Sequence, residues 1–224
     1  MALSQRLQRV LQMVPKTKTI ADVGTDHGYL AVELVRSHKA KAVIAIDVNE
    51  GPLNSAKAYV ASEGLSNVID CRLGDGLQVT KIGEVDCAIM CGMGGELMQH
   101  IIRIGPEWLN RYILQPQSHR SELKQFLVQK GYAIIEEACL VENDHYYDIW
   151  HVEKGQSIYN TLPSDSLLWE YGALLQAEHS VVWQSHIQKQ QAEYESIYEK
   201  LPAAHPKRLA VAAILDAFRK ELQR

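Results

Sequence analysis

The stretch Ile20-Ala21-Asp22-Val23-Gly24-Thr25-Asp26-His27-Gly28-Tyr29-Leu30 decides the fold. It begins as the apolar end of a predicted strand, passes through a turn that contains Gly24 and Gly28, and ends in the first residues of a predicted helix. Glycines in such a turn let the backbone approach a ligand closely, and the start of the helix directs N–H groups towards it. The stretch therefore predicts a strand–turn–helix unit whose turn binds a nucleotide-like ligand.

Predicted strands and helices alternate over the first two thirds of the chain. Apolar runs predict the strands, and amphipathic segments between them predict the helices. The predicted strands cover residues 19–23, 42–47, 68–73, 85–90, 111–114, 133–137 and 145–152, and the predicted helices cover residues 4–14, 27–37, 53–63, 96–104 and 118–130. This alternation is typical of an α/β fold with a doubly wound, mostly parallel sheet, in which the ligand lies outside the carboxyl ends of the strands.

The pattern changes after Gly155. Apolar residues from Leu167 to Leu201 recur in steps of three and four, which predicts one long helix with a coiled-coil seam, and a second helix follows at 207–222. We therefore expect two domains, an α/β domain at residues 1–157 and a C-terminal α-helical hairpin at residues 158–224. Residues 160–224 contain seven Lys or Arg and eight Asp or Glu, so charge alone does not predict an RNA-binding arm. A packing or dimerising role is the simpler interpretation.

The composition is that of an ordinary globular protein. The chain has 224 residues, of which 46% are hydrophobic and 22% charged, and its formal net charge is −4. It has no run of about 18 apolar residues that would predict a membrane span. Its four cysteines lack paired metal-ligand spacing, although the three residues between Cys87 and Cys91 leave a zinc site as a less favoured alternative. We expect a cytoplasmic monomer that binds no metal.

Basic residues gather near the N-terminus. Residues 1–20 contain Arg6, Arg9, Lys16 and Lys18 and no acidic residue. One interpretation is a solvated helix face. The other is a patch that contacts nucleic-acid phosphates, in which case these four residues are the predicted substrate-binding residues.

Acidic residues at the predicted strand ends distinguish between nucleotide ligands. Asp47 stands 23 positions after Gly24, where a carboxylate accepts both hydroxyls of a ribose in dinucleotide and S-adenosylmethionine sites. The first turn has no Gly-x-Gly-x-x-Gly pattern, and Asp22 and Asp26 would repel a pyrophosphate but suit the ammonium and sulfonium charges of S-adenosylmethionine. Asp75, after the third strand, suits an adenine amino group. The sequence thus favours S-adenosylmethionine over a dinucleotide.

The predicted cofactor-binding residues all lie at the carboxyl ends of the first four strands. They are Asp22, Gly24, Thr25, His27, Gly28, Asp47, Val48, Asp75, Gly76 and Gly92.

Four motifs together carry a family resemblance. They are Asp22-Val23-Gly24-Thr25-Asp26-His27-Gly28-Tyr29-Leu30, Gly74-Asp75-Gly76-Leu77, Gly92-Met93-Gly94-Gly95 and Leu114-Gln115-Pro116-Gln117. In them the chain resembles the bacterial tRNA (adenine-N1)-methyltransferases that modify adenine 22. The resemblance implies a class I Rossmann-like methyltransferase domain, S-adenosylmethionine as the methyl donor with S-adenosylhomocysteine as the product, and tRNA as the substrate.

The residues predicted to act on the adenine follow the first, fourth and fifth strands. They are Asp26, Met93, Gly94, Gln115 and Gln117. Asp26 could face either the cofactor or the adenine, the glycines admit a flat base, Met93 could pack on it, and the two amides could bind its edge. The Asn-Pro-Pro-Tyr motif of many amino-methylating enzymes is absent, which argues against transfer to an exocyclic amine. The alternatives are a non-catalytic S-adenosylmethionine- or RNA-binding module and a methyltransferase that acts on another substrate.

Overall fold

The computed structural model describes residues 3–222, and the chain forms two compact units, residues 1–157 and residues 158–224. The first unit contains the sheet and the second is helical. Among the described residues, no helix is long and apolar enough to cross a lipid bilayer.

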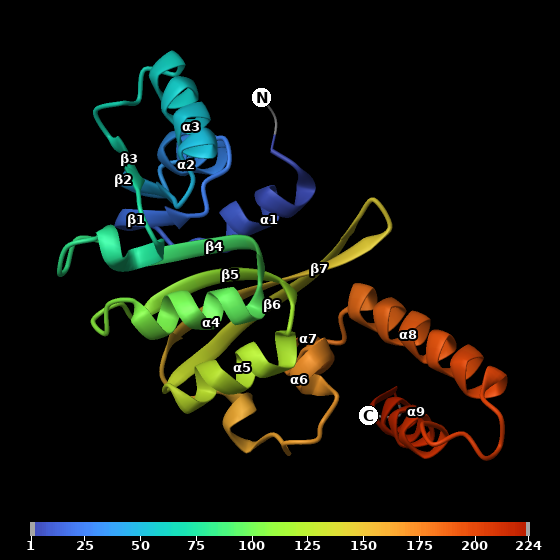
Figure 1. The fold of residues 1–224 in the computed structure, drawn as a ribbon. Helices are drawn as coiled ribbons and strands as arrows, with labels where there is room; N and C mark the ends of the chain where they lie inside the picture. The colour runs from blue at the N-terminus through green and yellow to red at the C-terminus, as the bar shows by residue number, and fades with distance from the viewer. Residues whose placement is uncertain (1–2, 223–224) are drawn as a thin grey trace. The chain divides into compact units, whose positions relative to one another are not determined.

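The first unit is built on a seven-stranded sheet with the strand order β3-β2-β1-β4-β5-β7-β6 (Figure 1). Its strands are β1 (Thr17–Val23), β2 (Ala40–Asp47), β3 (Ile69–Leu73), β4 (Cys87–Gly94), β5 (Arg111–Ser118), β6 (Tyr132–Glu142) and β7 (His145–Lys154). The pairs among β1 to β5 are parallel, and β7 pairs antiparallel with both β5 and β6. The prediction of a doubly wound, mostly parallel sheet is confirmed. The order reverses between β1 and β4, and a crevice forms where the connections diverge at such a point.

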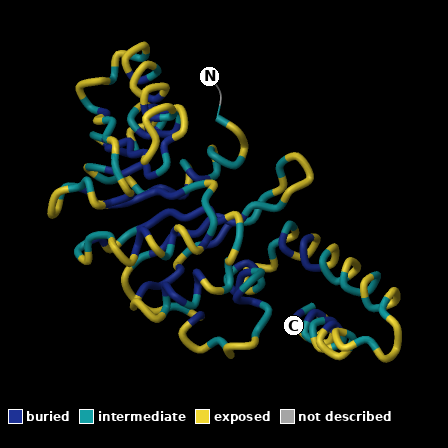
Figure 2. The backbone as a smooth tube through the Cα atoms, viewed as in Figure 1, coloured by how far each residue is buried: buried dark blue, intermediate teal, exposed yellow. Residues whose placement is uncertain are grey.

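Helices cover both faces of this sheet. The helices of the first unit are α1 (Gln5–Met13), α2 (Tyr29–Arg36), α3 (Glu50–Ser62), the 3-10 helix η1 (Gly76–Val79), α4 (Gly95–Ile104) and α5 (Arg120–Gln129). Apolar residues of α1, α2 and α3 share one core with alternate residues of the strands, whereas α4 and α5 pack against each other and against β4, β5 and β6 (Figure 1). The central strands are therefore buried on both faces, which explains their nearly continuous apolar sequence (Figure 2).

Two strands reach beyond their predicted ends. Residues 91–94 continue β4 and residues 115–118 continue β5, so both motifs lie on paired strand extensions rather than in the expected loops. The register of the β4–β5 pair shifts between Cys91 and Met93. Gly92 lies at this shift with φ +72°, a conformation that favours glycine. The shift is a β-bulge, and β4 continues beyond it as far as Gly94.

The last two strands form a longer hairpin than the sequence predicts. They pair from Tyr132 with Lys154 to Glu142 with His145, and the exposed tip consists of Asn143 and Asp144 (Figure 2). Both tip residues have positive φ, as a tight two-residue hairpin turn requires. The Glu142 carboxylate accepts hydrogen bonds from the backbone N–H groups of Gln5 (2.6 Å) and Arg6 (3.4 Å), and it therefore fixes the start of α1.

The second unit ends in the predicted pair of helices, but its first part is broken. Its elements are the 3-10 helix η2 (Ile158–Thr161), α6 (Leu168–Tyr171), α7 (Ala173–Ala177), α8 (Val181–Lys200) and α9 (Arg208–Leu222). The prediction of one long helix through Leu167 to Leu201 is wrong, because the chain turns at Gly172 and again at His179, where φ is +52°. The Ser180 hydroxyl then caps α8 by accepting a hydrogen bond from the Trp183 N–H.

Candidate functional site

The carboxyl edge of the sheet contains two small cavities that meet at Gly24. One, of about 190 Å³, lies between the turn after β1 and the start of α1. The other, of about 210 Å³, lies across the ends of β2, β3 and β4. Gly24 lines both. Together they fall in the range of small-molecule sites, about 300–1,000 Å³, and they occupy the crevice where the strand order reverses.

The second cavity contains the carboxylate predicted to bind a ribose. Asp47 is the last residue of β2 and is 9% exposed, and its Oδ1 accepts a hydrogen bond of 2.7 Å from the backbone N–H of Asn49. This bond fixes the carboxylate at the start of α3. Gly24, Asp75, Gly76 and the exposed Val48 line the same cavity, so five predicted cofactor residues come together here.

The first cavity contains two carboxylates in different surroundings. Asp22 is 6% exposed, whereas the Asp26 side chain is 78% exposed and lies 3.5 Å from Nε2 of His27. Burial raises the pKa of the Asp22 carboxyl to about 6, the Thr25 hydroxyl opposes this rise, and the neighbouring Asp47 carboxylate adds to it. A bound cation would offset the negative charge of the ionised Asp22 carboxylate, which burial disfavours.

The turn after β1 joins the two cavities. The backbone N–H groups of Gly24 and Thr25 both donate to the Ile46 carbonyl, at 2.8 and 3.0 Å, so the turn is tied to the end of β2. Gly24 has φ +77°, and a Cβ atom there would clash with the methyl group of Met93. Met93 therefore lies directly against Gly24, at the junction of the two cavities.

The two predicted amides differ in exposure. Gln115 is fully buried, and its Oε1 accepts hydrogen bonds from the Gly92 N–H (3.0 Å) and from Nη1 of Arg6 (2.5 Å). Gln117 is exposed, and its amide nitrogen lies 3.6 Å from where a Cβ atom of Gly92 would stand. Of the two, only Gln117 has an amide available to a base edge. The Gln115 oxygen supports Gly92 and Arg6, and a contact of its side chain with the base stays a prediction.

The four basic residues do not form one patch. Arg6 lines the first cavity, and Nη2 of Arg9 lies 3.2 Å from Oε1 of Glu136. Lys16 and Lys18 lie at the amino end of β1, and the length of that strand, about 20 Å at ~3.3 Å per residue, separates them from the cavities. The prediction that these four residues form one cluster is therefore wrong, because α1 and β1 place them at different edges of the sheet.

Several contacts of the site lie beyond what the sequence reveals. Leu97 and Ile101 of α4 form a wall of the second cavity, and Tyr147 of β7 lies under the Arg6 guanidinium, with 5.3 Å between its carbon and the ring centroid. The helical spacing of Leu97 and Ile101 signals only a buried face. More than a hundred residues separate Arg6 from Tyr147, and no local pattern connects them.

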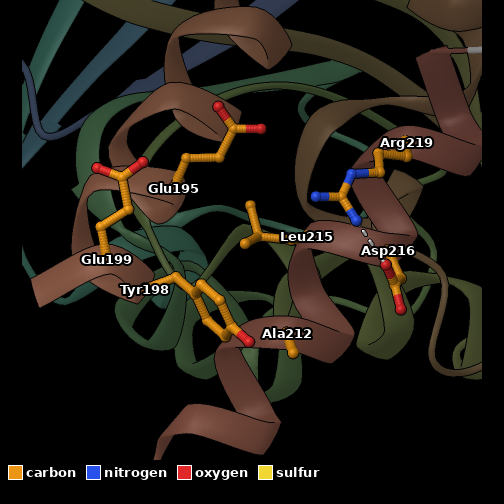
Figure 3. A pocket seen from close by; sticks show the side chains of 7 residues that line it. All are labelled: Glu195, Tyr198, Glu199, Ala212, Leu215, Asp216 and Arg219. Carbon is orange, nitrogen blue, oxygen red and sulfur yellow. Dashed lines mark hydrogen bonds and ion pairs between the residues drawn. The ribbon is translucent and has the colours of Figure 1, made fainter. Parts of the chain in front are cut away.

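A further cavity, of about 510 Å³, lies in the second unit between α8 and α9 (Figure 3). Its polar lining includes Glu195 and Glu199 from α8 and Asp216 from α9, and Arg219 lies 2.9 Å from Asp216. Carboxylates repel RNA phosphates, so this cavity does not suit contacts with the RNA backbone.

The residues at the sheet edge fit S-adenosylmethionine. Asp47 and Asp75 lie in one cavity and Asp22 and Asp26 in the other, which separates the acceptors suited to an adenosine from those suited to cationic groups. A buried carboxylate whose pKa is raised to about 6 matches a cationic ligand. Within residues 3–222, no group of three or more His, Cys, Asp or Glu side chains could hold a metal ion.

Comparisons with known proteins agree with this fit. The family model described as "Methyltransferase domain" matches residues 3–150. The tRNA (adenine(22)-N(1))-methyltransferase of Bacillus subtilis is 38% identical over 204 residues, which cover 87% of this chain and 85% of that protein.

Solved structures match the whole chain. Mycoplasma capricolum TrmK, in complex with S-adenosylhomocysteine, superposes with a TM-score of 0.87 at 28% identity over 99% of this chain and 98% of that one. Streptococcus pneumoniae Sp1610, in complex with S-adenosyl-L-methionine, superposes with a TM-score of 0.85 at 31% identity over 99% of this chain and all of that one. The chain belongs to the tRNA (adenine(22)-N(1))-methyltransferase family.

Proposed function

We propose that this protein transfers a methyl group from S-adenosylmethionine to N1 of an adenine in tRNA, at the position 22 for which its Bacillus subtilis relative is named. The observation that carries the proposal is the pair of acid-lined cavities that meet at Gly24, in a chain that matches this family over nearly its full length. We propose that the protein works as a monomer in the cytoplasm.

The cofactor would be held by residues of both cavities. Asp47 is placed to accept the ribose hydroxyls, because Asn49 holds its carboxylate at the cavity wall. Asp75 lies in the same cavity and offers an acceptor to the adenine amino group. Asp22 faces the other cavity and offers its carboxylate to the cationic groups. When bound, S-adenosylmethionine supplies an electrophilic methyl group on a positively charged sulfur.

The remaining predicted cofactor residues shape the turn and the bulge. Thr25 is 2% exposed beside Asp22, and His27 and Gly28 line the first cavity with it. Gly76 is buried, and a Cβ atom there would lie 2.8 Å from a methyl group of Ile101, so a larger residue would narrow the adenosine cavity. Gly92 stands at the bulge of β4.

The acceptor side of the site would position the adenine rather than deprotonate it. N1 of adenine carries an in-plane lone pair and no proton, so no general base is needed before the methyl group is transferred. N1 lies on the Watson–Crick edge, and the base must therefore be unpaired or flipped out to reach the site. Orientation of the two reactants can then supply several kcal/mol, up to roughly ten.

The residues suited to this positioning lie around Gly92. The exposed amide of Gln117 can bind a base edge, and Gly92 and Gly94 let the backbone approach a flat ring. Met93 offers an apolar side chain at the cavity junction. The exposed Asp26 can stabilise the positive charge that develops on the methylated ring.

The test is to map methyl transfer onto unmodified, transcribed tRNA. The protein is incubated with a labelled methyl donor and with two transcripts that differ only in having adenine or guanine at position 22. We expect label in the first transcript alone, together with a reverse-transcription stop at that adenine, because a methyl group on N1 blocks the pairing edge.

Other outcomes would favour the alternatives. Label at another site or in another class of molecule would indicate a methyltransferase with a different substrate. Normal cofactor binding without transfer to any tRNA would indicate a non-catalytic binding module.

A further inference from the structure

Arg6 is the one Lys or Arg among the described residues that line the two cavities of the sheet edge. The same linings contain four aspartates: Asp22 and Asp26 in the first cavity, Asp47 and Asp75 in the second. A ligand that carries an anionic group next to these carboxylates needs a compensating cation close to that group. The Arg6 guanidinium meets this need in the first cavity.

The Arg6 side chain is held on several sides. Its Nη1 donates a hydrogen bond of 2.5 Å to Oε1 of the fully buried Gln115, and its guanidinium carbon lies 5.3 Å from the centre of the Tyr147 ring. The Glu142 carboxylate fixes the backbone at the start of α1. A guanidinium fork held in this way loses little freedom when it binds a carboxylate.

Arg6 also has donors to spare. A guanidinium carries five N–H donors, and the bond to Gln115 uses one of them. The arrangement of donors in the fork matches the two oxygens of a carboxylate.

The charges of the cavity match those of the methionine part of S-adenosylmethionine. That part carries a sulfonium cation, an ammonium cation and one carboxylate. Asp22 and Asp26 suit the two cations, but they carry the same charge as the methionine carboxylate and cannot bind it. The carboxylate therefore needs a cationic partner. We propose that Arg6 binds the methionine carboxylate of S-adenosylmethionine. The assignment rests on the proposed function and gives Arg6 a role different from contact with an RNA phosphate.

The assignment also gives Gln115 a function. Its side-chain oxygen joins the Arg6 guanidinium to the Gly92 N–H, so one buried amide connects the carboxylate site to the bulge of β4. Gln115 is a positioning residue in this scheme, because it touches Arg6 and Gly92 rather than the reactants.

The test compares two ligands that differ only in the carboxylate. Calorimetry measures the affinity of the protein for S-adenosylmethionine and for decarboxylated S-adenosylmethionine. For the wild type we expect the decarboxylated ligand to bind about 10- to 100-fold more weakly, which is the scale of a charge-assisted pair. In Arg6→Gln the two affinities should agree to within about threefold. Arg6→Lys, which keeps the charge and loses the fork, should give an intermediate ratio.

Arg9→Gln is the matched control. Arg9 lies one turn further along α1, outside both cavity linings, so this variant should keep the wild-type ratio between the two ligands. Circular dichroism and thermal melting verify that each variant is folded. The readout is a ratio of two affinities in the same variant, and a general loss of binding leaves that ratio unchanged.

Three results would overturn the assignment. One is an Arg6→Gln variant that discriminates between the two ligands as strongly as the wild type does. Another is a variant with normal affinity for both ligands and weakened binding of tRNA, which would make Arg6 an RNA contact. The third is a wild-type protein that binds neither ligand. That result alone would also refute the proposed function, so the two failures are distinguishable.

Discussion

Replacing Asp22 by asparagine should stabilise the cofactor-free protein and weaken cofactor binding. Burial raises the pKa of this carboxyl from 3.8 to about 6, so the native state binds the proton more tightly than the unfolded chain does. Stability therefore falls as the pH rises from about 4 to about 6. Since one pKa unit corresponds to about 1.4 kcal/mol, the ionised carboxylate costs up to about 3 kcal/mol at pH 7.5.

The size of the effect should depend on pH in a defined way. At pH 4.5 Asp22 is mostly protonated in the native state, and the same two pKa values leave a cost of about 1 kcal/mol. Part of the gain is lost because the asparagine amide brings N–H donors into a buried position. We therefore expect Asp22→Asn to raise the free energy of unfolding by about 1–3 kcal/mol at pH 7.5 and by clearly less at pH 4.5.

Urea denaturation without cofactor, at both pH values, measures this difference. Asp26→Asn is the matched control, because it makes the same substitution at a side chain that is 78% exposed and should change stability by less than about 0.5 kcal/mol. Calorimetry should show at least about tenfold weaker binding of S-adenosylmethionine by Asp22→Asn, since a charge-assisted contact contributes about 1.5–3 kcal/mol. Asp22→Asn stability at or below that of the wild type at pH 7.5, or a difference independent of pH, would refute the reasoning.

Further substitutions examine three separate parts of the molecule. Asp47→Ala should weaken cofactor binding by about 10-fold or more, since it removes the proposed ribose acceptor, and near-normal affinity by calorimetry would exclude that role. Arg9→Ala should reduce by about one the slope of log affinity for tRNA against log salt concentration. Lys18→Ala, at the opposite edge of the sheet, should leave that slope unchanged. Equal slopes in the two variants would contradict this. Lys124→Met should lower the free energy of unfolding by about 3–5 kcal/mol, because its ammonium lies 2.7 Å from the buried Glu137 carboxylate, and a loss below about 1 kcal/mol by urea denaturation would count against it.

The parts of the fold that depend on local pattern were predictable from the sequence. Apolar runs separated by amphipathic segments gave the sheet class, because the alternation of strand and helix leaves few ways to bury both faces. The acids at the strand ends predicted where the two cavities lie, because parallel strands bring their carboxyl ends to one edge of the sheet. Asp47 and Asp75, 28 residues apart, thus line one cavity.

The parts that depend on long-range contacts were not predictable. Gln115 and Gln117 stand two positions apart and would share one face of a regular strand, yet Gln115 is buried and Gln117 is exposed. The register of β5 against β4 shifts over this segment, so the regular alternation does not hold there. Arg6 was grouped with Lys16 and Lys18 by sequence proximity, but α1 carries it to the cavity edge, where Gln115 holds it. The coiled-coil spacing predicted a helix through His179 because periodicity does not register a single residue with positive φ.

The buried charges of this protein divide into two kinds. Lys124 with Glu137 and Arg120 with Asp148 form ion pairs beneath α5, at 2.7 and 2.8 Å, so the fold itself supplies the partner. Asp22 differs, because the groups that shift its pKa include no cation and the nearby Asp47 carboxylate makes ionisation less favourable still. A chain selected only for stability would place an apolar or amide residue at this strand end. The Asp22 carboxylate has no such partner, and the one guanidinium in the described lining of its cavity is already held by Gln115. A cationic ligand that completes the site therefore best explains this carboxylate.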